Sequence, residues 1–296
     1  MTIFSRISNW HLPANLKASF QKDGYVILRN RFTQVERDGL INSVMEVKNW
    51  PNIPNRHMHY EEVDRNGNRI LTITENFVDY HKQLGQLLRS NVLAKLVEEL
   101  TGKPMVLFKA SPALHEGIWY SERSSLFHQE KIVYKSPGGG GFPAHTDAPS
   151  YQHIGPDSFQ SLAMAVEPAK LENGCVEVVP GSHLLSDIPT RPDQCIDDDW
   201  CAKQDWVPVE LDTGDIFIFS SLLVHRSANN DSKLGRAMLY ATFNPIREGG
   251  DRRHEYYKHR RAEWPATFER EVGKSYTEGR DRYAWGTPMI TVEGAA

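Results

Sequence analysis

The feature that most constrains the fold is a series of short β-type segments that begins at Lys131. The segments are KIVYK, SLAMAVEP, CVEVVPGSH, WVPVEL, DIFIFS and RAMLYATF, at residues 131–135, 161–168, 175–183, 206–211, 215–220 and 236–243. Turn-forming sequences separate them, among them ENG at 172–174, PGS at 180–182 and DTGD at 212–215. Several short strands joined by turns are typical of a β-sandwich or a jelly roll.

The residues before this series have a different pattern. DGYVILRN, at 23–30, has the apolar content of a short strand, and TQVE at 33–36 is a capping box that opens a helix toward Trp50. A second helix is expected from Ser90 to Gly102. We therefore predict a single domain over residues 1–296, mainly β with flanking helices. It has a helix-rich part at about 1–105, a jelly-roll core at about 106–245 and a C-terminal extension at 246–296.

Composition excludes several functional classes. The chain has 296 residues, of which 40% are apolar and 24% charged. Its formal net charge of -4 lacks the excess of basic residues that is typical of a nucleic-acid-binding protein. No segment has the length and apolar content of a membrane span, and the start of the chain does not resemble a secretory signal. We expect a cytoplasmic protein that acts on a small molecule, without nucleic-acid or membrane partners; its oligomeric state is not indicated. The three cysteines have no CxxC spacing, which argues against a disulfide framework and a thiolate zinc site.

A candidate metal site lies in the segment FPAHTDAP at residues 142–149. On a strand, the spacing of His145 and Asp147 puts both side chains on the same face, where they can ligate one cation. An HxD pair is common by chance, so a third ligand is needed, and His225 at the end of the segment DIFIFS is the candidate. Two imidazoles and a carboxylate on one octahedral face leave positions open, the arrangement that non-haem iron(II) oxygenases use.

A cation follows the third ligand. Arg236 opens the next β-type segment eleven residues after His225, where a guanidinium near the metal can pair bidentately with a carboxylate. The pattern therefore points to a carboxylate cosubstrate as well as to a metal.

Taken together, these motifs resemble the phytanoyl-CoA dioxygenase (PhyH) family. The resemblance rests on EKIVYKSPGGGGFPAHTDAP at 130–149, ENGCVEVVPGSH at 172–183, and then His225 and Arg236. It implies a double-stranded β-helix, the cupin-like jelly roll, in which His145, Asp147 and His225 are the catalytic centre and bind iron(II). It also implies that Arg236 binds the distal carboxylate of 2-oxoglutarate.

The resemblance departs from the family pattern at one position. Many relatives carry an Asn where this chain has Val133, so Lys131 and Tyr134 become the candidates for additional cosubstrate contacts. Lys131 is alternatively a solvated strand residue, and Tyr134 a core aromatic. Weaker candidates for lining the pocket are Trp119, Tyr120 and the segments 58–61 and 75–77.

The implied function is that of an iron(II)- and 2-oxoglutarate-dependent dioxygenase. Such an enzyme uses oxygen to hydroxylate or otherwise oxidise a C–H bond of a small metabolite and releases succinate and carbon dioxide, with ascorbate as a stimulant. Related halogenases have a small residue in place of the carboxylate ligand, so Asp147 favours hydroxylation over halogenation. The alternative is a cupin-like zinc hydrolase or isomerase with the same three ligands. The sequence does not select a substrate.

Overall fold

The computed structural model describes residue 4 and residues 12–64, 66–103, 105–106, 129–151, 153, 159–245, 253–285 and 287. Its helices are α1 (Ala14–Asp23), α2 (Gln34–Lys48), α3 (Lys82–Leu88), α4 (Asn91–Thr101), α5 (Asp198–Cys201), α6 (Arg253–Glu263) and α7 (Thr277–Tyr283). Its strands are β1 (Tyr25–Leu28), β2 (Met58–Val63), β3 (Arg69–Glu75), β4 (Met105–Val106), β5 (Glu130–Lys135), β6 (Phe142–His145), β7 (Gln160–Ala165), β8 (Val176–Val178), β9 (Val207–Val209), β10 (Ile216–Ser220), β11 (His225–Ser227) and β12 (Arg236–Pro245).

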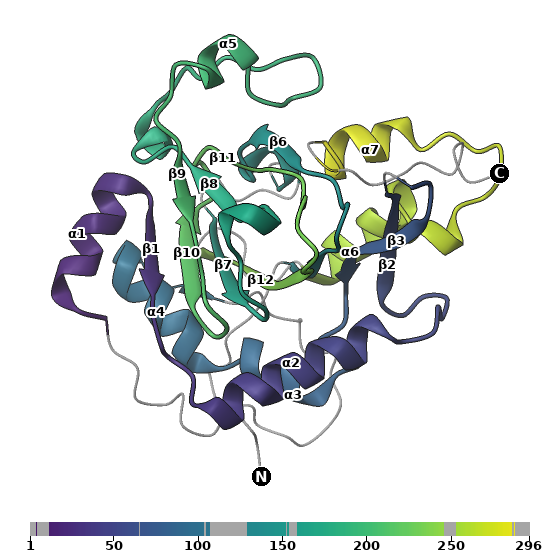
Figure 1. Cartoon of the computed structure of the whole chain (residues 1–296), viewed down its shortest axis with the longest axis horizontal. Coiled ribbons are helices and arrows are strands. Elements are labelled where there is room, and N and C mark those ends of the chain that lie inside the picture. The colour runs from purple at the N-terminus through teal and green to yellow at the C-terminus, as the bar shows by residue number, and fades with distance from the viewer. Residues whose placement is uncertain are drawn as a thin grey trace.

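The strands form two sheets that face each other. The major sheet has the order β1-β10-β7-β12-β5-β3-β2, with β4 paired to β12, and the minor sheet has the order β6-β11-β8-β9. Neighbouring strands pair in antiparallel fashion throughout the described part of the chain. Figure 1 shows the minor sheet stacked over the middle of the major one. The predicted mainly β, jelly-roll fold with flanking helices is confirmed.

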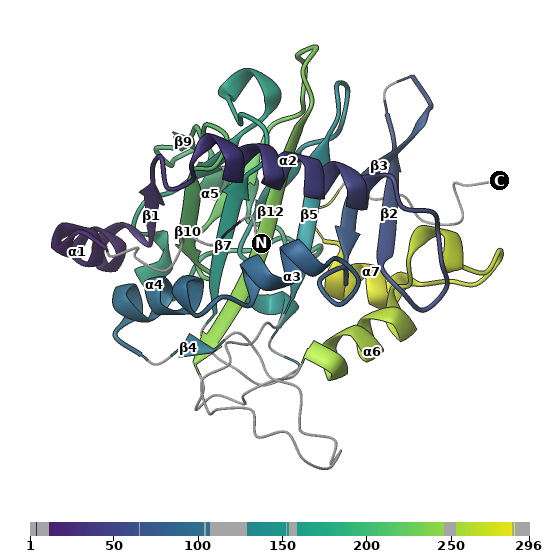
Figure 2. The same cartoon turned by 90° about the horizontal axis from the view of Figure 1, so that it is seen from below.

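Helices α2, α3 and α4 cover the other face of the major sheet, as Figure 2 shows. The Thr33 side chain accepts from the Glu36 backbone N–H at 3.3 Å, and Glu36 accepts from the Thr33 N–H at 2.8 Å, so the predicted capping box opens α2. The predicted second helix is α4, which ends at Gly102 with φ 68°. Apolar side chains of these helices pack on Ile132 and on other residues that point to this face of the sheet.

The opposite face of the major sheet forms the space between the sheets. Side chains alternate along a strand, so residues of β5 and β12 that are two apart share a face. In the register Arg236 pairs with Lys135, Met238 with Val133 and Tyr240 with Lys131. Met238 packs in a second core cluster together with apolar residues of β8 and β9, which fixes this face as the inner one.

Two features of the fold go beyond the predicted elements. The helix-rich first part also contains the hairpin β2–β3, which lengthens the major sheet by pairing β3 with β5. After β12 the chain forms α6 and α7, which lie beside β2 and β3 (Figure 1). No helix in the described ranges is both long and apolar enough to span a bilayer.

Candidate metal centre

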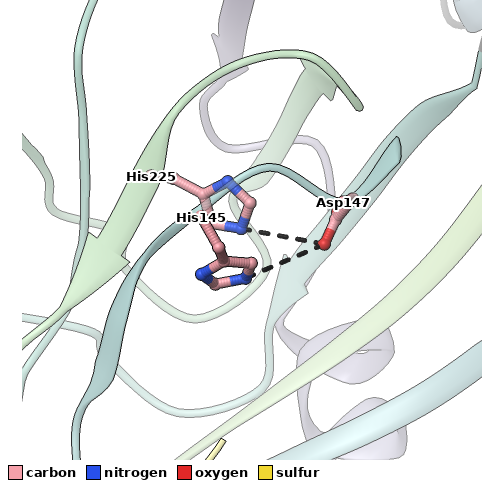
Figure 3. A group of neighbouring side chains, drawn as sticks. All are labelled: His145, Asp147 and His225. Carbon is pink, nitrogen blue, oxygen red and sulfur yellow. Dashed lines mark ion pairs between the residues drawn. The ribbon is translucent and has the colours of Figure 1, made fainter. Parts of the chain in front are cut away.

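Three side chains converge at one end of the space between the sheets. His145 ends β6, Asp147 follows two residues later, and His225 begins β11. His145 Nε2 lies 4.0 Å and His225 Nε2 3.8 Å from Asp147 Oδ1, as Figure 3 shows. One ligand atom from each residue lies within 4.8 Å of the other two, and no other such group of three or more occurs among the described residues. This cluster has the ligand types and the close spacing that a divalent cation requires.

The way in which the chain builds this cluster differs from the sequence-based expectation. Asp147 lies beyond the end of β6, next to the short 3-10 helix η2 (Ala148–Ser150), so a turn rather than strand alternation brings it beside His145. His225 does not end the strand β10. It belongs to β11 in the minor sheet, where it pairs directly with His145. The cross-strand pairing explains why the two imidazole centroids are only 4.2 Å apart.

Hydrogen bonds hold the three ligands in orientation. His145 Nδ1 lies 2.7 Å from the Pro143 carbonyl oxygen, and His225 Nδ1 lies 3.0 Å from the Leu223 carbonyl oxygen. A carbonyl accepts only from a protonated nitrogen, so each Nε2 retains its lone pair and faces the centre. Ser161 on β7 donates to Asp147 Oδ2 at 2.9 Å, which leaves Oδ1 directed toward the imidazoles.

The protonation states suit metal binding. Burial lowers the pKa of His145 to about 3, and the neighbouring His225 acts in the same direction. Burial alone raises the pKa of Asp147, but His225, Lys131 and His145 outweigh it, and the net pKa lies below the ordinary aspartate value. A neutral imidazole and an ionised carboxylate are the ligand forms, so His145 and Asp147 need lose no proton near neutral pH to bind a cation.

Arg236 lines the same pocket as the three ligands. Its Nη2 and Nε donate to the Gly174 carbonyl oxygen at 2.6 and 3.1 Å, while the buried Nη1 has no hydrogen-bond partner in the described part of the chain. Gly174 has φ +71°, and a Cβ there would lie 2.4 Å from the Ala228 carbonyl oxygen, so this turn requires glycine. The backbone thus fixes one edge of the guanidinium and leaves a donor of the other edge unpaired.

The two remaining predicted residues have opposite outcomes. Lys131 lines the same pocket as His145, Asp147 and Arg236, and its Nζ lies 5.4 Å from the Tyr240 ring centroid. Tyr134 is wrong as a pocket residue. It points to the helix-covered face of the major sheet, where its hydroxyl accepts from Thr74 Oγ1 at 3.4 Å. Lys131 and Tyr134 are three residues apart on β5, so strand alternation directs them to opposite faces.

Besides Arg226, sequence reasoning missed two polar residues of this pocket, Ser227 and Tyr240. Both follow from alternation, because Ser227 is two residues after His225 on β11 and Tyr240 is four residues after Arg236 on β12. Tyr240 lies close enough to Arg236 for a polar contact, and burial raises its pKa above the ordinary tyrosine value.

Comparison with known proteins agrees with this geometry. Residues 20–238 match the phytanoyl-CoA dioxygenase (PhyH) family. The chain belongs to this family. It is an enzyme of the non-haem iron, 2-oxoglutarate-dependent dioxygenase class.

Two relatives of this PhyH enzyme match over most of their length. This chain is 30% identical over 274 residues to the 2-aminoethylphosphonate dioxygenase of an uncultured bacterium, HF130_AEPn_1, and the match covers 92% of this chain and 97% of the relative. It is 33% identical over 242 residues to the methylphosphonate hydroxylase of Gimesia maris, covering 82% of this chain and 84% of the relative.

A solved structure supports the fold. EctD from S. alaskensis, crystallised with 2-oxoglutarate and 5-hydroxyectoine, superposes with a TM-score of 0.62 at 18% identity. The superposition covers 83% of this chain and 81% of EctD.

A second chamber adjoins the metal centre of the PhyH enzyme. It shares Lys131, Phe142, His145 and Asp147 with the pocket that contains Arg236, called here the arginine pocket, and residues of α6 and α7 line it. Most of its further lining is polar: Glu75, Gln129, Ser150, Tyr151, Tyr256, Arg260, Tyr283 and Thr287, with Ile73 and Trp285 as the apolar members. Glu75 was among the weaker sequence-based candidates for the pocket, whereas Trp119 and Tyr120 lie outside the described residues. The outer wall comes from residues after 238, beyond the family match.

Proposed function

We propose that this PhyH enzyme binds iron(II) through His145, Asp147 and His225 and hydroxylates a C–H bond of a small polar metabolite. With 2-oxoglutarate and oxygen, the bound iron supplies the oxidising chemistry, and succinate and carbon dioxide are released. The observation that carries the proposal is the unpaired Nη1 of a buried Arg236 in the same pocket as the three ligands. A zinc hydrolase or isomerase has no use for such a dicarboxylate subsite.

The residues fit both the metal and the cosubstrate. Two neutral imidazoles and one carboxylate occupy one face of an octahedral ion and leave the other positions to ligands from solution. Arg236 is 3% exposed, so an unpaired donor there is costly until a carboxylate accepts from it. A planar guanidinium with one free edge matches a carboxylate. Lys131, which lines both pockets, is the proposed second contact to the cosubstrate.

The chamber beyond the metal supports a small, polar substrate. Its lining offers hydroxyl, amide and charged groups, and such groups lose hydrogen bonds with water when an acyl chain covers them. We therefore infer an oxygen-rich substrate rather than a long acyl group. The two relatives named for phosphonates favour a small organophosphonate, whose anionic oxygens suit the ammonium group at the boundary of the two pockets.

The test follows succinate release by the purified protein with iron(II), ascorbate and 2-oxoglutarate. Substrates are 2-aminoethylphosphonate, methylphosphonate, β-alanine as the carboxylate counterpart of the first, and a long-chain acyl-CoA. We expect succinate above the substrate-free rate with a phosphonate and none with the acyl-CoA. A higher rate with β-alanine than with either phosphonate would indicate that the substrate is a carboxylate instead. A substrate-dependent rate with acyl-CoA alone contradicts the inference from the polar chamber.

The metal assignment is tested separately. His145→Ala, Asp147→Ala and His225→Ala should each lose iron(II) binding and succinate release, because two remaining ligands hold a labile ion poorly. Circular dichroism should remain that of the native protein. Native turnover in any of the three variants removes that residue from the metal site.

A further inference from the structure

Lys135 is a buried amine that the proposed reaction does not use. It lies at the end of β5, directly opposite Arg236 in the register, and its residue is 2% exposed. Burying a lysine is costly unless its amine has hydrogen-bond or ion-pair partners, so the contacts of Lys135 are informative. Two basic side chains therefore lie side by side on the inner face of the major sheet.

The contacts of Lys135 connect it to the pocket. Its Nζ donates to Ser227 Oγ at 2.8 Å and to the Ala228 carbonyl oxygen at 2.6 Å. Ser227 lines the same pocket as Arg236, and its hydroxyl donates to no acceptor within the described ranges. In its ammonium form Lys135 has three donors and no acceptor, so it engages the Ser227 oxygen and leaves the hydroxyl proton to be donated elsewhere.

We propose that Lys135 is a positioning residue of the cosubstrate subsite, which holds the Ser227 hydroxyl so that it donates to the same distal carboxylate as Arg236. The inference rests on the proposed function, because it requires a dicarboxylate in this pocket. Lys135 itself acts through Ser227 and through its charge. The subsite then combines a guanidinium edge, an oriented hydroxyl and a second cation.

The electrostatics of the pocket should make 2-oxoglutarate binding depend on pH. Burial lowers the pKa of Lys135 to about 6, Arg236 on β12 acts in the same direction, and Glu62 on β2 and Cys175 before β8 oppose them. Near pH 7.5 the amine of the free protein is therefore mostly neutral. A carboxylate placed beside it favours the ammonium form, so its pKa rises on binding. Cosubstrate binding should take up a proton, and affinity should fall as pH rises above 6.

The experiment compares 2-oxoglutarate with 2-oxopentanoate, which has a methyl group in place of the distal carboxylate. Binding to the iron(II)-loaded protein is measured by anaerobic titration calorimetry at pH 7.5, in two buffers of different ionisation enthalpy. Lys135→Met should weaken 2-oxoglutarate binding about tenfold, which corresponds to about 1.4 kcal/mol, and leave 2-oxopentanoate unchanged. The proton uptake of the native protein should be lost.

Ser227→Ala provides a second route that spares the buried amine. It should also reduce the preference for 2-oxoglutarate, and the double variant should lose less than the two single variants together, because Lys135 acts in part through Ser227. A native preference ratio in Ser227→Ala, or in a folded Lys135→Met, overturns the proposal and makes Lys135 a structural residue. If the native protein itself shows no preference for 2-oxoglutarate, the proposed function fails first.

Discussion

Replacing Arg260 by Met tests whether a buried ion pair holds the outer wall of the chamber. On α6, Arg260 Nε and Nη2 donate to the two carboxylate oxygens of Glu75 at 2.8 and 2.6 Å, and Nη1 donates to the Tyr283 carbonyl oxygen at 3.2 Å. The two side chains are 2% and 1% exposed. Burial alone lowers the pKa of Arg260, but Glu75 raises it well above the ordinary arginine value, so the guanidinium is charged. The variant leaves the carboxylate buried without its counter-ion.

The magnitude follows from this geometry. Removing one partner of a buried, hydrogen-bonded ion pair costs about 3–5 kcal/mol, because the other charge stays buried and unpaired. In the native protein Gln129 donates to Glu75 at 3.1 Å. Adding Glu75→Gln removes the charge, and the amide oxygen at this position can still accept from Gln129. The double variant should therefore be more stable than Arg260→Met by more than about 1 kcal/mol, although less stable than the native protein.

The assay is equilibrium urea unfolding followed by tryptophan fluorescence. Arg280→Met on α7 is the matched control, because Arg280 pairs with Asp281 at 3.0 Å where the two side chains are 47% and 56% exposed. An exposed pair contributes about 0–1 kcal/mol, so the control should unfold almost like the native protein. A loss below about 1 kcal/mol in Arg260→Met, or a double variant no more stable than the single one, refutes the argument.

Three further outcomes follow from the site and the core. Arg236→Ala should raise the 2-oxoglutarate concentration needed for succinate release by about one to two orders of magnitude, the equivalent of roughly 1.5–3 kcal/mol. If the variant titrates like the native enzyme, another cation binds the distal carboxylate. The native enzyme should form oxygenated product in high chloride, since Asp147 fills the position that a halide needs; mass spectrometry of a chlorinated product contradicts this. His57 is fully buried with neither ring nitrogen paired in the described residues, and burial lowers its pKa to about 4. The unfolded chain binds this proton first, so unfolding free energy should decrease from about pH 6.5 to 4 and less so in His57→Leu.

The sequence was most informative where local chemistry and spacing act together. The capping box at Thr33 and the glycine after α4 predicted helix ends because both depend on hydrogen bonds within a few residues. The ligands His145 and His225 were found as well, yet the reason given for their approach was incomplete. Their proximity depends on the pairing of β6 with β11, a contact between segments 80 residues apart that no local pattern records.

Tyr134 shows a different kind of failure. Tyr134 and Lys131 are both candidates because they lie near Val133, where many relatives carry an Asn, although alternation allows only one of two residues three apart on a strand to face the pocket. Applying that rule to β5 selects Lys131, Val133 and Lys135 together, and the structure places them on the inner face. The error was thus avoidable from sequence, and so was the omission of the hairpin β2–β3, whose turn contains the hairpin-forming dipeptide Asn66-Gly67.

The sequence indicates the type of reaction but not the substrate, and this difference has a structural cause. The two histidine ligands and Arg236 come from strands inside the family match, where strand pairing fixes their side chains, and Asp147 follows β6 within the same match. The outer chamber is built differently, since α6 and α7 contribute Arg260 and Tyr283 from the segment after residue 238. Side-chain contacts rather than strand pairing attach α6 to the sheet, among them Arg260–Glu75 and Arg253–Glu130. A wall attached by side chains can change its lining without disturbing the strands that hold the metal ligands. The motifs in the strands therefore predict the reaction, and we propose that substrate selection depends on the packing of α6 and α7.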